Sequence, residues 1–350
     1  MVKGPIDGEE SERVRRAKAE ARPTLEEVAA LAGVGRGTVS RVINGSPRVS
    51  AQARQAVQAA IEELGYVPNR AARTLVTRRT DTVALVLSED EERLFAEPYF
   101  ADIIRGISSA LNDTGLQLMF TLARSARDHD RLKQYLTGHH VDGVMLISLH
   151  EADPLPVLLE RHGVPTVLGG RPVGQDPGEV SYVDADNEGG AYQAVAYLVG
   201  RGRRRIATIA GPQDMGVGID RLAGYRRALG DLPELVAYAD FSEEGGHRAM
   251  RELLDRDPGL DAVFVASDNM ALGALRALRA AGRHVPDDVA VVGFEDSAAG
   301  RAEPPLTTVH QPTERMGREM VQLLVARMRG ERTGHAAVIV DTRLVVRESA

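Results

Sequence analysis

The sequence predicts a small all-α head of three helices, followed by an α/β core made of two lobes. Three short amphipathic helices fit between Thr24 and Gly65, with a tight turn at Gly33 between the first two. From Thr82 onward, β-branched apolar runs alternate with helical segments, a pattern typical of parallel sheets covered by helices. This second part has about 270 residues, more than one compact lobe usually holds, so we expect two lobes.

Capping residues set the expected helix boundaries in the head. Thr24 and Glu27 form a capping box, because the Thr hydroxyl can accept from the third helical amide while the Glu carboxylate accepts from the Thr amide. Gly33 suits the left-handed position that ends a helix. The other boundary signals are the restart after Val34, the stop at Asn44-Gly45, the cap Ser50 and the end at Gly65.

The core is expected to alternate strands and helices. Thr82–Leu87 is a β-branched apolar run, as in a parallel strand buried on both faces. The other strands are expected at Val141–Ser148, Pro165–Gly169, Arg205–Ala210, Ala262–Ala266 and Val289–Gly293, with a last strand-like stretch at Val338–Val346. Helices are expected at Ile103–Leu111, Arg131–Gly138, Leu155–His162, Gly190–Gly200, Leu222–Leu229, Gly245–Leu254, Met270–Ala280 and Thr313–Met328.

Composition excludes several classes of protein. The chain has no Cys, which excludes a disulfide framework, a thiolate zinc site and a Cys nucleophile. No stretch approaches the roughly 18 apolar residues of a transmembrane helix. Residues 1–21, expected to be a disordered tail, lack the apolar run of a signal peptide. We therefore expect a cytoplasmic protein without a membrane partner.

Charge is distributed unevenly along the chain. Residues 22–80 hold nine Arg and no Lys against four Glu, a net charge of +5, whereas the whole chain carries −7. Residues 1–21 are balanced, so the remainder carries −12. A basic head on an acidic body is typical of a protein that binds a polyanion at one end, although chance fluctuation of surface charge is an alternative.

No catalytic centre, cofactor or metal site is expected. The sequence has no Walker loop, no HExxH and no Gly-x-Ser-x-Gly. His139 and His140 are adjacent and would not share a helix face, so they make a poor metal site. Asp184 and Asp186 have the spacing of a strand pair, for which structural roles are favoured. Because no nucleophile and base come together, we predict that the chain is not an enzyme.

The head and several core motifs resemble the lactose/galactose-repressor family of transcriptional regulators. Residues 24–44, TLEEVAALAGVGRGTVSRVIN, are similar to that family's DNA-binding head, and residues 64–75, LGYVPNRAARTL, to its hinge. The core motifs follow in the family's order: Gly211-Pro212, Arg221–Tyr225, Ser267–Ala274, Val291–Phe294 and Pro305–Thr308. The resemblance covers nearly all of residues 24–348. It implies a homodimer on a palindromic operator in double-stranded DNA, and a core like the periplasmic sugar-binding proteins.

The resemblance also implies domain boundaries. The helix-turn-helix domain is expected over 22–67, and the hinge helix and linker over 68–80. The chain would cross between the lobes three times. One lobe would take 81–181 and 312–339, and the other 182–311 and 340–350. The predicted fold class is a helix-turn-helix head plus a periplasmic-binding-protein-like core of two doubly wound parallel-sheet lobes.

By resemblance, the second helix of the head enters the major groove of DNA. Arg36, Gly37 and Arg41 then fall at base-reading positions, where Arg can bond guanine through two hydrogen bonds. Phosphate contact is the alternative for both Arg residues, and Gly37 has no side chain to bond a base. Gly35 stands where the family frequently has Ser, which removes a side-chain cap. Caps or phosphate contacts are expected for Thr24, Thr38, Ser40, Asn44 and Ser50.

The hinge segment is too short to form a stable helix alone, so it needs a partner to order it. By resemblance, two Leu75 side chains, one per subunit, would wedge into the minor groove and bend the operator. Packing of Leu75 on the core is the alternative. The other hinge residues expected at the DNA are Asn69, Arg70, Ala72 and Arg73. An effector that reorients the lobes would then melt the hinge helices and release the operator.

A sugar effector is expected between the lobes, because such a site needs polar groups for hydroxyls and an aromatic face for the ring. The expected contacts are Phe95, Tyr99, Arg171, Arg221, Phe241, Asp268 and Glu295. Structural alternatives stay open for three of them. Asp268 would serve only as a helix cap, Arg221 would form an ion pair with Asp220 or Glu295, and Phe95 would belong to the core.

The sequence most resembles actinobacterial repressors of cello-oligosaccharide use, through residues 73–84, 94–98 and 210–215. Gly170 and Ile219 stand where the family often has an acid and an Arg, so the lactose repressor's ligand does not carry over. We predict a repressor of sugar-utilisation genes, released by cellobiose or another cello-oligosaccharide. The alternatives are an activator, a regulator with a non-sugar effector, and a transport-type binding protein, which the head argues against. Without a C-terminal heptad helix, a dimer is favoured over a tetramer.

Overall fold

The computed structural model describes residues 23–67, 79–123, 126–151, 153–174, 176 and 178–350. It divides into two compact units, residues 1–80 and 81–350. The tail expected over 1–21 and most of the hinge expected over 68–80 lie outside the described residues.

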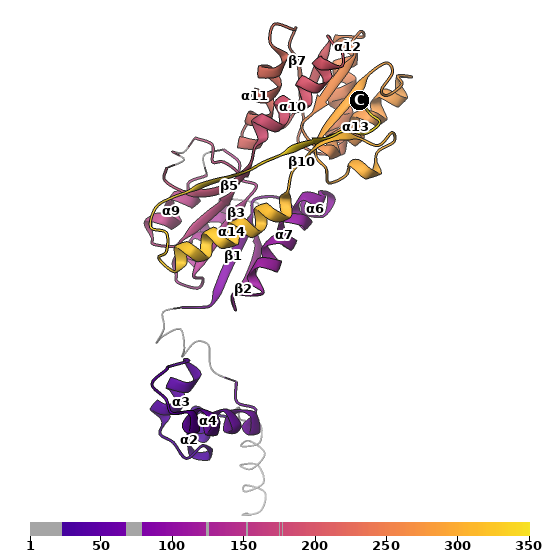
Figure 1. Cartoon of the computed structure of the whole chain (residues 1–350). Helices are drawn as coiled ribbons and strands as arrows, with labels where there is room; N and C mark the ends of the chain where they lie inside the picture. Colours follow the sequence, from indigo (N-terminus) through magenta and orange to yellow (C-terminus); the bar gives the residue numbers. More distant parts are fainter. Residues whose placement is uncertain (1–22, 68–78, 124–125, 152, 175, 177) are drawn as a thin grey trace, which may run out of the picture. The chain divides into compact units, whose positions relative to one another are not determined.

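The described part of the first unit holds three helices around a small apolar core (Figure 1). They are α2 (Leu25–Leu31), α3 (Arg36–Ile43) and α4 (Ala51–Leu64). The predicted capping box is present: Glu27 N donates to Thr24 Oγ1 at 3.3 Å, and Thr24 N donates to the Glu27 carboxylate at 2.8 Å. Gly65 ends α4 in the left-handed conformation at φ +61°, as its position predicted.

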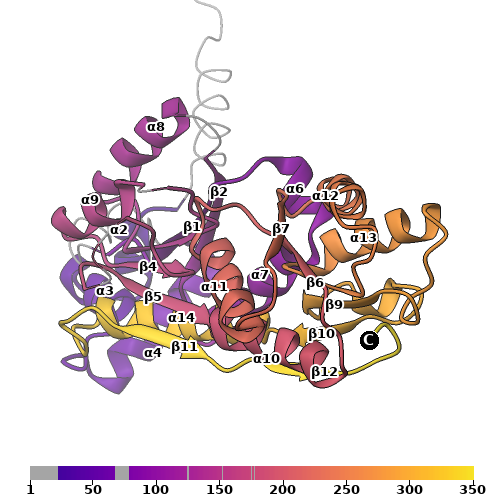
Figure 2. The same cartoon turned by 90° about the horizontal axis from the view of Figure 1, so that it is seen from above.

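The second unit contains two six-stranded sheets, one in each lobe (Figures 1 and 2). The first-lobe sheet has the order β11-β5-β4-β3-β1-β2, and the second-lobe sheet has the order β12-β10-β9-β8-β6-β7. All neighbours pair in parallel except β10 and β12, which are antiparallel. The first-lobe strands are β1 (Thr82–Leu87), β2 (Gln117–Leu122), β3 (Gly143–Ile147), β4 (Thr166–Gly169), β5 (Ser181–Ala185) and β11 (Ala337–Val340). The second-lobe strands are β6 (Ile206–Ala210), β7 (Leu235–Tyr238), β8 (Ala262–Val265), β9 (Ala290–Glu295), β10 (Thr307–His310) and β12 (Arg343–Val345).

Helices cover both faces of each sheet, which confirms the predicted doubly wound class. In the first lobe, α7 and α14 pack on one face while α8 and α9 pack on the other. In the second lobe, α12 and α13 oppose α10 and α11 in the same way. The first-lobe helices are α6 (Glu91–Ala96), α7 (Pro98–Leu111), α8 (Ala126–Thr137), α9 (Leu155–Arg161) and α14 (Thr313–Met328). The second-lobe helices are α10 (Asn187–Gly200), α11 (Gly216–Leu229), α12 (Glu243–Arg256), α13 (Asp268–Ala280) and the 3-10 turn Ala299–Arg301.

The chain crosses between the lobes three times: from β5 to α10, from β10 to α14, and from β11 to β12. Figure 2 shows the third crossing as the yellow ribbon that runs from β11 to β12. Strand β5 pairs with β4 as far as Val183 and with β11 as far as Ala185, so the first lobe extends beyond the boundary expected at residue 181. Strand β11 likewise keeps Val340 in the first lobe, one residue beyond the expected 339.

The predicted alternation of strands and helices is confirmed, and β1 has the predicted bounds. Four strands, β2, β5, β7 and β10, and the short helix α6 were not predicted from the sequence. The strand-like end of the chain is two strands, because Asp341 and Thr342 form the third crossing between them. No helix in the described part of the chain is long and apolar enough to span a membrane.

Candidate functional site

A cavity lies between the two lobes of the core. Its empty volume is about 850 Å³, open mouth included, and both lobes line it. Tyr99 and Asp184 come from the first lobe, whereas Arg221, Phe241 and Glu295 come from the second. Open α/β sheets bind ligands beyond the carboxyl ends of their strands, where Asp184 and Glu295 stand. The volume lies in the range of small-molecule sites.

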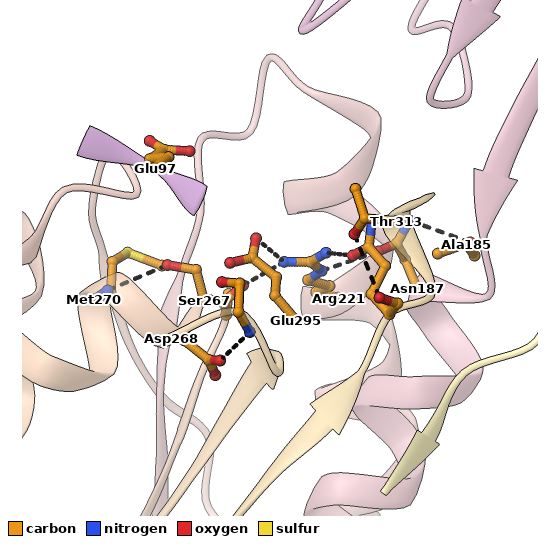
Figure 3. A network of polar contacts seen from close by, with 12 residues as sticks. Glu97, Ala185, Asn187, Arg221, Ser267, Asp268, Met270, Glu295 and Thr313 are labelled. Carbon is orange, nitrogen blue, oxygen red and sulfur yellow. Dashed lines mark hydrogen bonds and ion pairs between the residues drawn. The ribbon is translucent and has the colours of Figure 1, made fainter. Parts of the chain in front are cut away.

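Arg221 of α11 is the central polar group of the cavity, and its residue is only 1% exposed. Its Nε donates to Asn187 Oδ1 at 2.9 Å, and its two terminal nitrogens donate to Ala266 O at 2.6 Å and Gln311 Oε1 at 2.8 Å. Figure 3 shows Arg221 between Asn187 and Glu295, whose carboxylate lies 3.4 Å from the guanidinium. Asn187 and Gln311 flank the first two crossings, so Arg221 ties both crossings to the second lobe.

Two shielded carboxyl groups face the same cavity. Burial raises the pKa of Glu295 to about 8, against the attraction of Arg221. Burial also raises the pKa of Asp184 to about 6, opposed by hydrogen bonds from the amides of Arg171 and Ala185. The raised pKa lets Glu295 take up a proton more readily than a free carboxyl, and in the protonated form it can donate as well as accept a hydrogen bond. That capacity suits a ligand rich in hydroxyl groups.

Aromatic rings supply the apolar wall. Tyr99 and Phe100 meet edge to face, with ring centroids 5.3 Å apart. Phe241 follows β7 in a left-handed conformation and is 5% exposed. The Arg93 guanidinium lies 5.4 Å from the centroid of the Phe241 ring. The cavity therefore combines aromatic faces with the polar groups around Arg221.

Two predicted effector contacts lie outside the cavity. Phe95 is on α6 and 84% exposed, so it belongs neither to the cavity nor to the core. Asp268 is fully buried, and its carboxylate accepts from Ser297 N at 2.9 Å and Thr308 Oγ1 at 2.6 Å. Asp268 therefore holds the segment after β9 in place, which corrects its predicted role as a contact; the helix cap itself is Ser267.

Arg171 lines the cavity, but its guanidinium is already paired with Asp220 of the second lobe. The Nε atom lies 3.0 Å from Asp220 Oδ2, and a terminal nitrogen lies 2.6 Å from Oδ1. Asp220 is therefore the partner of Arg171, and Glu295 is the partner of Arg221. Of the two ion pairs considered for Arg221, the structure contains the one with Glu295.

Sequence reasoning missed several polar residues of the cavity wall, among them Glu97, Asp184, Asn187 and Gln311. Asp184 and Asn187 flank the end of β5, and Gln311 follows β10, two strands that were not predicted. A polar residue directly after a short apolar run would have been the signal. Asp184 was assigned a structural role, and it does accept from Arg171 N at 2.9 Å, but it also faces the cavity.

The predicted DNA-contacting residues of the head lie on α3 and its flanks. Arg36, Gly37, Arg41 and Asn44 are exposed, and Thr38 and Ser40 are partly buried. Arg36 pairs with Glu26 at 3.0 Å, but the side chains are 74% and 59% exposed, so the pair is weak. Gly35 caps α3 without a side-chain hydrogen bond, as the substitution for Ser predicted. Thr24 caps α2. The predicted hinge contacts Asn69, Arg70, Ala72, Arg73 and Leu75 lie outside the described residues.

A helix-turn-helix head with exposed arginines, joined to a two-lobed core with a polar cavity, defines a ligand-responsive DNA-binding regulator. Comparison with known families agrees. Residues 24–69 match the model of the bacterial regulatory proteins of the lacI family, and residues 195–350 match a periplasmic binding protein-like domain. The chain belongs to the lacI family of transcriptional regulators, which confirms the predicted resemblance.

Individual relatives extend over almost the whole chain. The transcriptional regulator CelR of Thermobifida fusca is 61% identical over 334 residues, covering 94% of this chain and 98% of the relative. The repressor CytR of Escherichia coli K12 is 32% identical over 95% of this chain and 97% of its own. A solved CelR–cellobiose complex is 58% identical, with a TM-score of 0.76 over 94% of this chain and 100% of that one. A lac repressor dimer bound to operator and an anti-inducer is 28% identical, with a TM-score of 0.82 over 94% and 99%.

Proposed function

We propose that this regulator is a cytoplasmic homodimer that represses sugar-utilisation genes and leaves its palindromic operator when a cello-oligosaccharide such as cellobiose binds the core. The observation that carries the proposal is the cavity of about 850 Å³ in which polar groups around Arg221 face the rings of Tyr99 and Phe241. The similarity to a regulator solved with cellobiose supports this choice of sugar.

Each side of the cavity has a distinct role in this proposal. The rings of Tyr99 and Phe241 pack against the C–H faces of the sugar, while Arg221 and Glu295 bond its hydroxyl groups. Arg171 acts at the cavity edge, where its pair with Asp220 joins the lobes. We infer that the chain acts by binding and not by catalysis, since it belongs to a family of transcriptional regulators.

In the head, α3 would enter the major groove, with Arg36 and Arg41 bonding guanine and Gly37 leaving room for close approach. Thr24, Thr38, Ser40 and Asn44 would contact phosphates, which position the head without specifying sequence. Asn69, Arg70, Ala72, Arg73 and Leu75 would form the minor-groove contacts of a hinge helix. Replacing Arg36 with Ala is expected to cost about 1–3 kcal/mol of operator affinity and to relax the preference at one base pair per half-site.

The test has two stages. Calorimetric titration of the full chain with cellobiose, cellotriose and maltose is expected to give micromolar binding for the β-linked sugars and none for maltose. Operators are then selected from a random DNA pool, and release is followed by fluorescence anisotropy as the sugar is added. Release supports a repressor, whereas tighter DNA binding indicates a corepressed regulator or an activator. If no sugar binds, the effector belongs to another chemical class. The DNA selection tests the head independently of that result.

A further inference from the structure

One imidazole joins the two lobes at the edge of the cavity. His150 follows β3 in the first lobe, and its Nδ1 lies 2.8 Å from Oδ2 of Asp214 in the second-lobe segment between β6 and α11. Its Nε2 lies 3.1 Å from Oε1 of Glu89, which follows β1. A backbone hydrogen bond from Glu151 N to Asp214 O at 2.8 Å runs beside this bridge. The first lobe therefore contacts one short second-lobe segment through both a side chain and the backbone.

Glu89 positions the imidazole. It is 9% exposed, and Oε1 also accepts from Ser148 Oγ at 2.5 Å and from Arg93 at 2.5 Å. Arg93 lies over the Phe241 ring of the second lobe, as described above. A single first-lobe carboxylate therefore holds two side chains, His150 and Arg93, that each touch the second lobe.

The bridge borders the cavity and is open to water. Ser148, Leu149 and Glu151, the neighbours of His150 in the chain, line the cavity, and so does Met215 beside Asp214. The side chains of His150 and Asp214 are 34% and 39% exposed. The bridge therefore stands beside the cavity, and the imidazole can exchange its proton with solvent.

We propose that His150, positioned by Glu89, is a latch that holds the lobes closed over the effector and raises effector affinity when the imidazole is protonated. A protonated imidazole donates from both ring nitrogens and so satisfies both carboxylates. A neutral imidazole donates from one nitrogen only, which leaves the other nitrogen facing a carboxylate oxygen without a proton between them. The identity of the effector rests on the proposed function, but the latch itself does not.

The direction of the pH effect follows from the groups around the ring. The hydrogen bond with Glu89, and then that with Asp214, raise the pKa of His150 above its ordinary value, against its partial burial. Arg93 donates to the same Glu89 oxygen, so this cation also faces the bridge. Opening the lobes removes Asp214, so the pKa is higher closed than open. The latch therefore contributes fully below the open-state pKa and is lost as pH rises through the closed-state pKa. Burial also raises the pKa of Asp184 to about 6 and that of Glu295 to about 8 in the cavity, and both carboxyl groups are retained in every variant of the tests.

The first test measures cellobiose affinity by calorimetry between pH 6 and pH 8.5. Cellobiose affinity is expected to fall more steeply with pH in the wild type than in His150→Gln. The difference between the two decreases should be about threefold, because one partly exposed ion pair contributes little. Asp214→Asn should flatten the profile in the same way. The matched control is His284→Gln, which removes an exposed histidine paired with Asp288 at 3.2 Å outside the cavity wall, and it should follow the wild type. Parallel profiles for all four proteins would overturn the proposal.

The second test needs no sugar. Protein labelled with ¹³C-histidine gives ring resonances by NMR, and the His150 signal is the one lost in His150→Gln. Its pKa is expected to be lower in Asp214→Asn than in the wild type, because one of the two carboxylates has lost its charge. An unchanged pKa would refute the latch even where cellobiose binds. A lowered pKa together with no cellobiose binding would support the latch and refute only the proposed effector.

Discussion

Two sets of contacts where the lobes meet differ in burial. The crossing cluster consists of Arg221, Asn187, Gln311 and Glu295, and lies where the chain passes between the lobes. The bridging contacts are His150 with Asp214, Arg171 with Asp220, and Arg93 with Phe241, and their ionic members are partly exposed. Unpairing a buried charge is costly, whereas an exposed ion pair contributes little. The difference indicates that the crossing cluster stays intact while the bridging contacts open and close.

The largest effect is expected from breaking the crossing cluster. Arg221→Met leaves Asn187, Gln311 and the Ala266 carbonyl without their buried partner and should lower the free energy of unfolding by about 3 kcal/mol. Chemical denaturation followed by circular dichroism measures this loss.

The matched control for that experiment is Arg227→Met on the same helix. The Arg227 side chain is 52% exposed and pairs with Glu188 at the surface, so its loss should cost less than about 0.5 kcal/mol. Equal costs for the two substitutions would remove the distinction between the crossing cluster and the exposed contacts.

Asp268→Ala should have the next largest effect, and on stability rather than on effector binding. It removes the buried acceptor of Ser297 N, Ala298 N and Thr308 Oγ1, at a cost of about 1–3 kcal/mol. Asp268→Asn should cost less, because its oxygen can face the amides while the Thr308 hydroxyl turns to accept. Cellobiose titration of both variants should stay within about twofold of wild type, since Asp268 does not line the cavity. A loss of affinity in Asp268→Asn without a loss of stability would restore Asp268 as a contact.

The sequence predicted most of the fold because local signals there are strong. The caps at Thr24 and Ser50 and the β-branched run of β1 each specify an element by themselves. The missed strands lack such signals. Strand β2 is at a sheet edge and only half-buried, and β5 contains Asp184 near its end and is followed by Asp186, so its apolar run is short.

The candidate site was predictable only in part, because the sequence does not show which way a polar side chain near the end of a strand points. Asp268 and Glu295 both stand near strand ends, yet Asp268 points into the lobe and Glu295 into the cavity. The partner of Arg171 was also missed, since Asp220 is 49 residues away and in the other lobe. Orientation and long-range pairing depend on tertiary packing, which local pattern does not encode.

Phe241→Leu tests the residue that belongs both to the cavity and to a bridging contact. Losing the aromatic face removes stacking on the sugar and the contact with Arg93, and effector affinity should fall about threefold to tenfold. The unfolding midpoint should change little, since Leu refills most of the buried space. Phe120→Leu on the edge strand β2 is the control, because Phe120 is 41% exposed and lies outside the cavity wall. An affinity loss equal to that control would mean that Phe241 only packs the core.

The smallest effect is expected for the bridge between Arg171 and Asp220. Their side chains are 31% and 23% exposed, so the bidentate geometry should give a coupling of only about 0.5–1 kcal/mol in effector affinity. A double-mutant cycle with Arg171→Gln and Asp220→Asn isolates that coupling from the other contacts of each residue. Raising the salt concentration should reduce it further, because partly exposed charges are screened. A coupling of 3 kcal/mol or more, insensitive to salt, would place this pair with the crossing cluster, and lobe opening would then have to leave it intact.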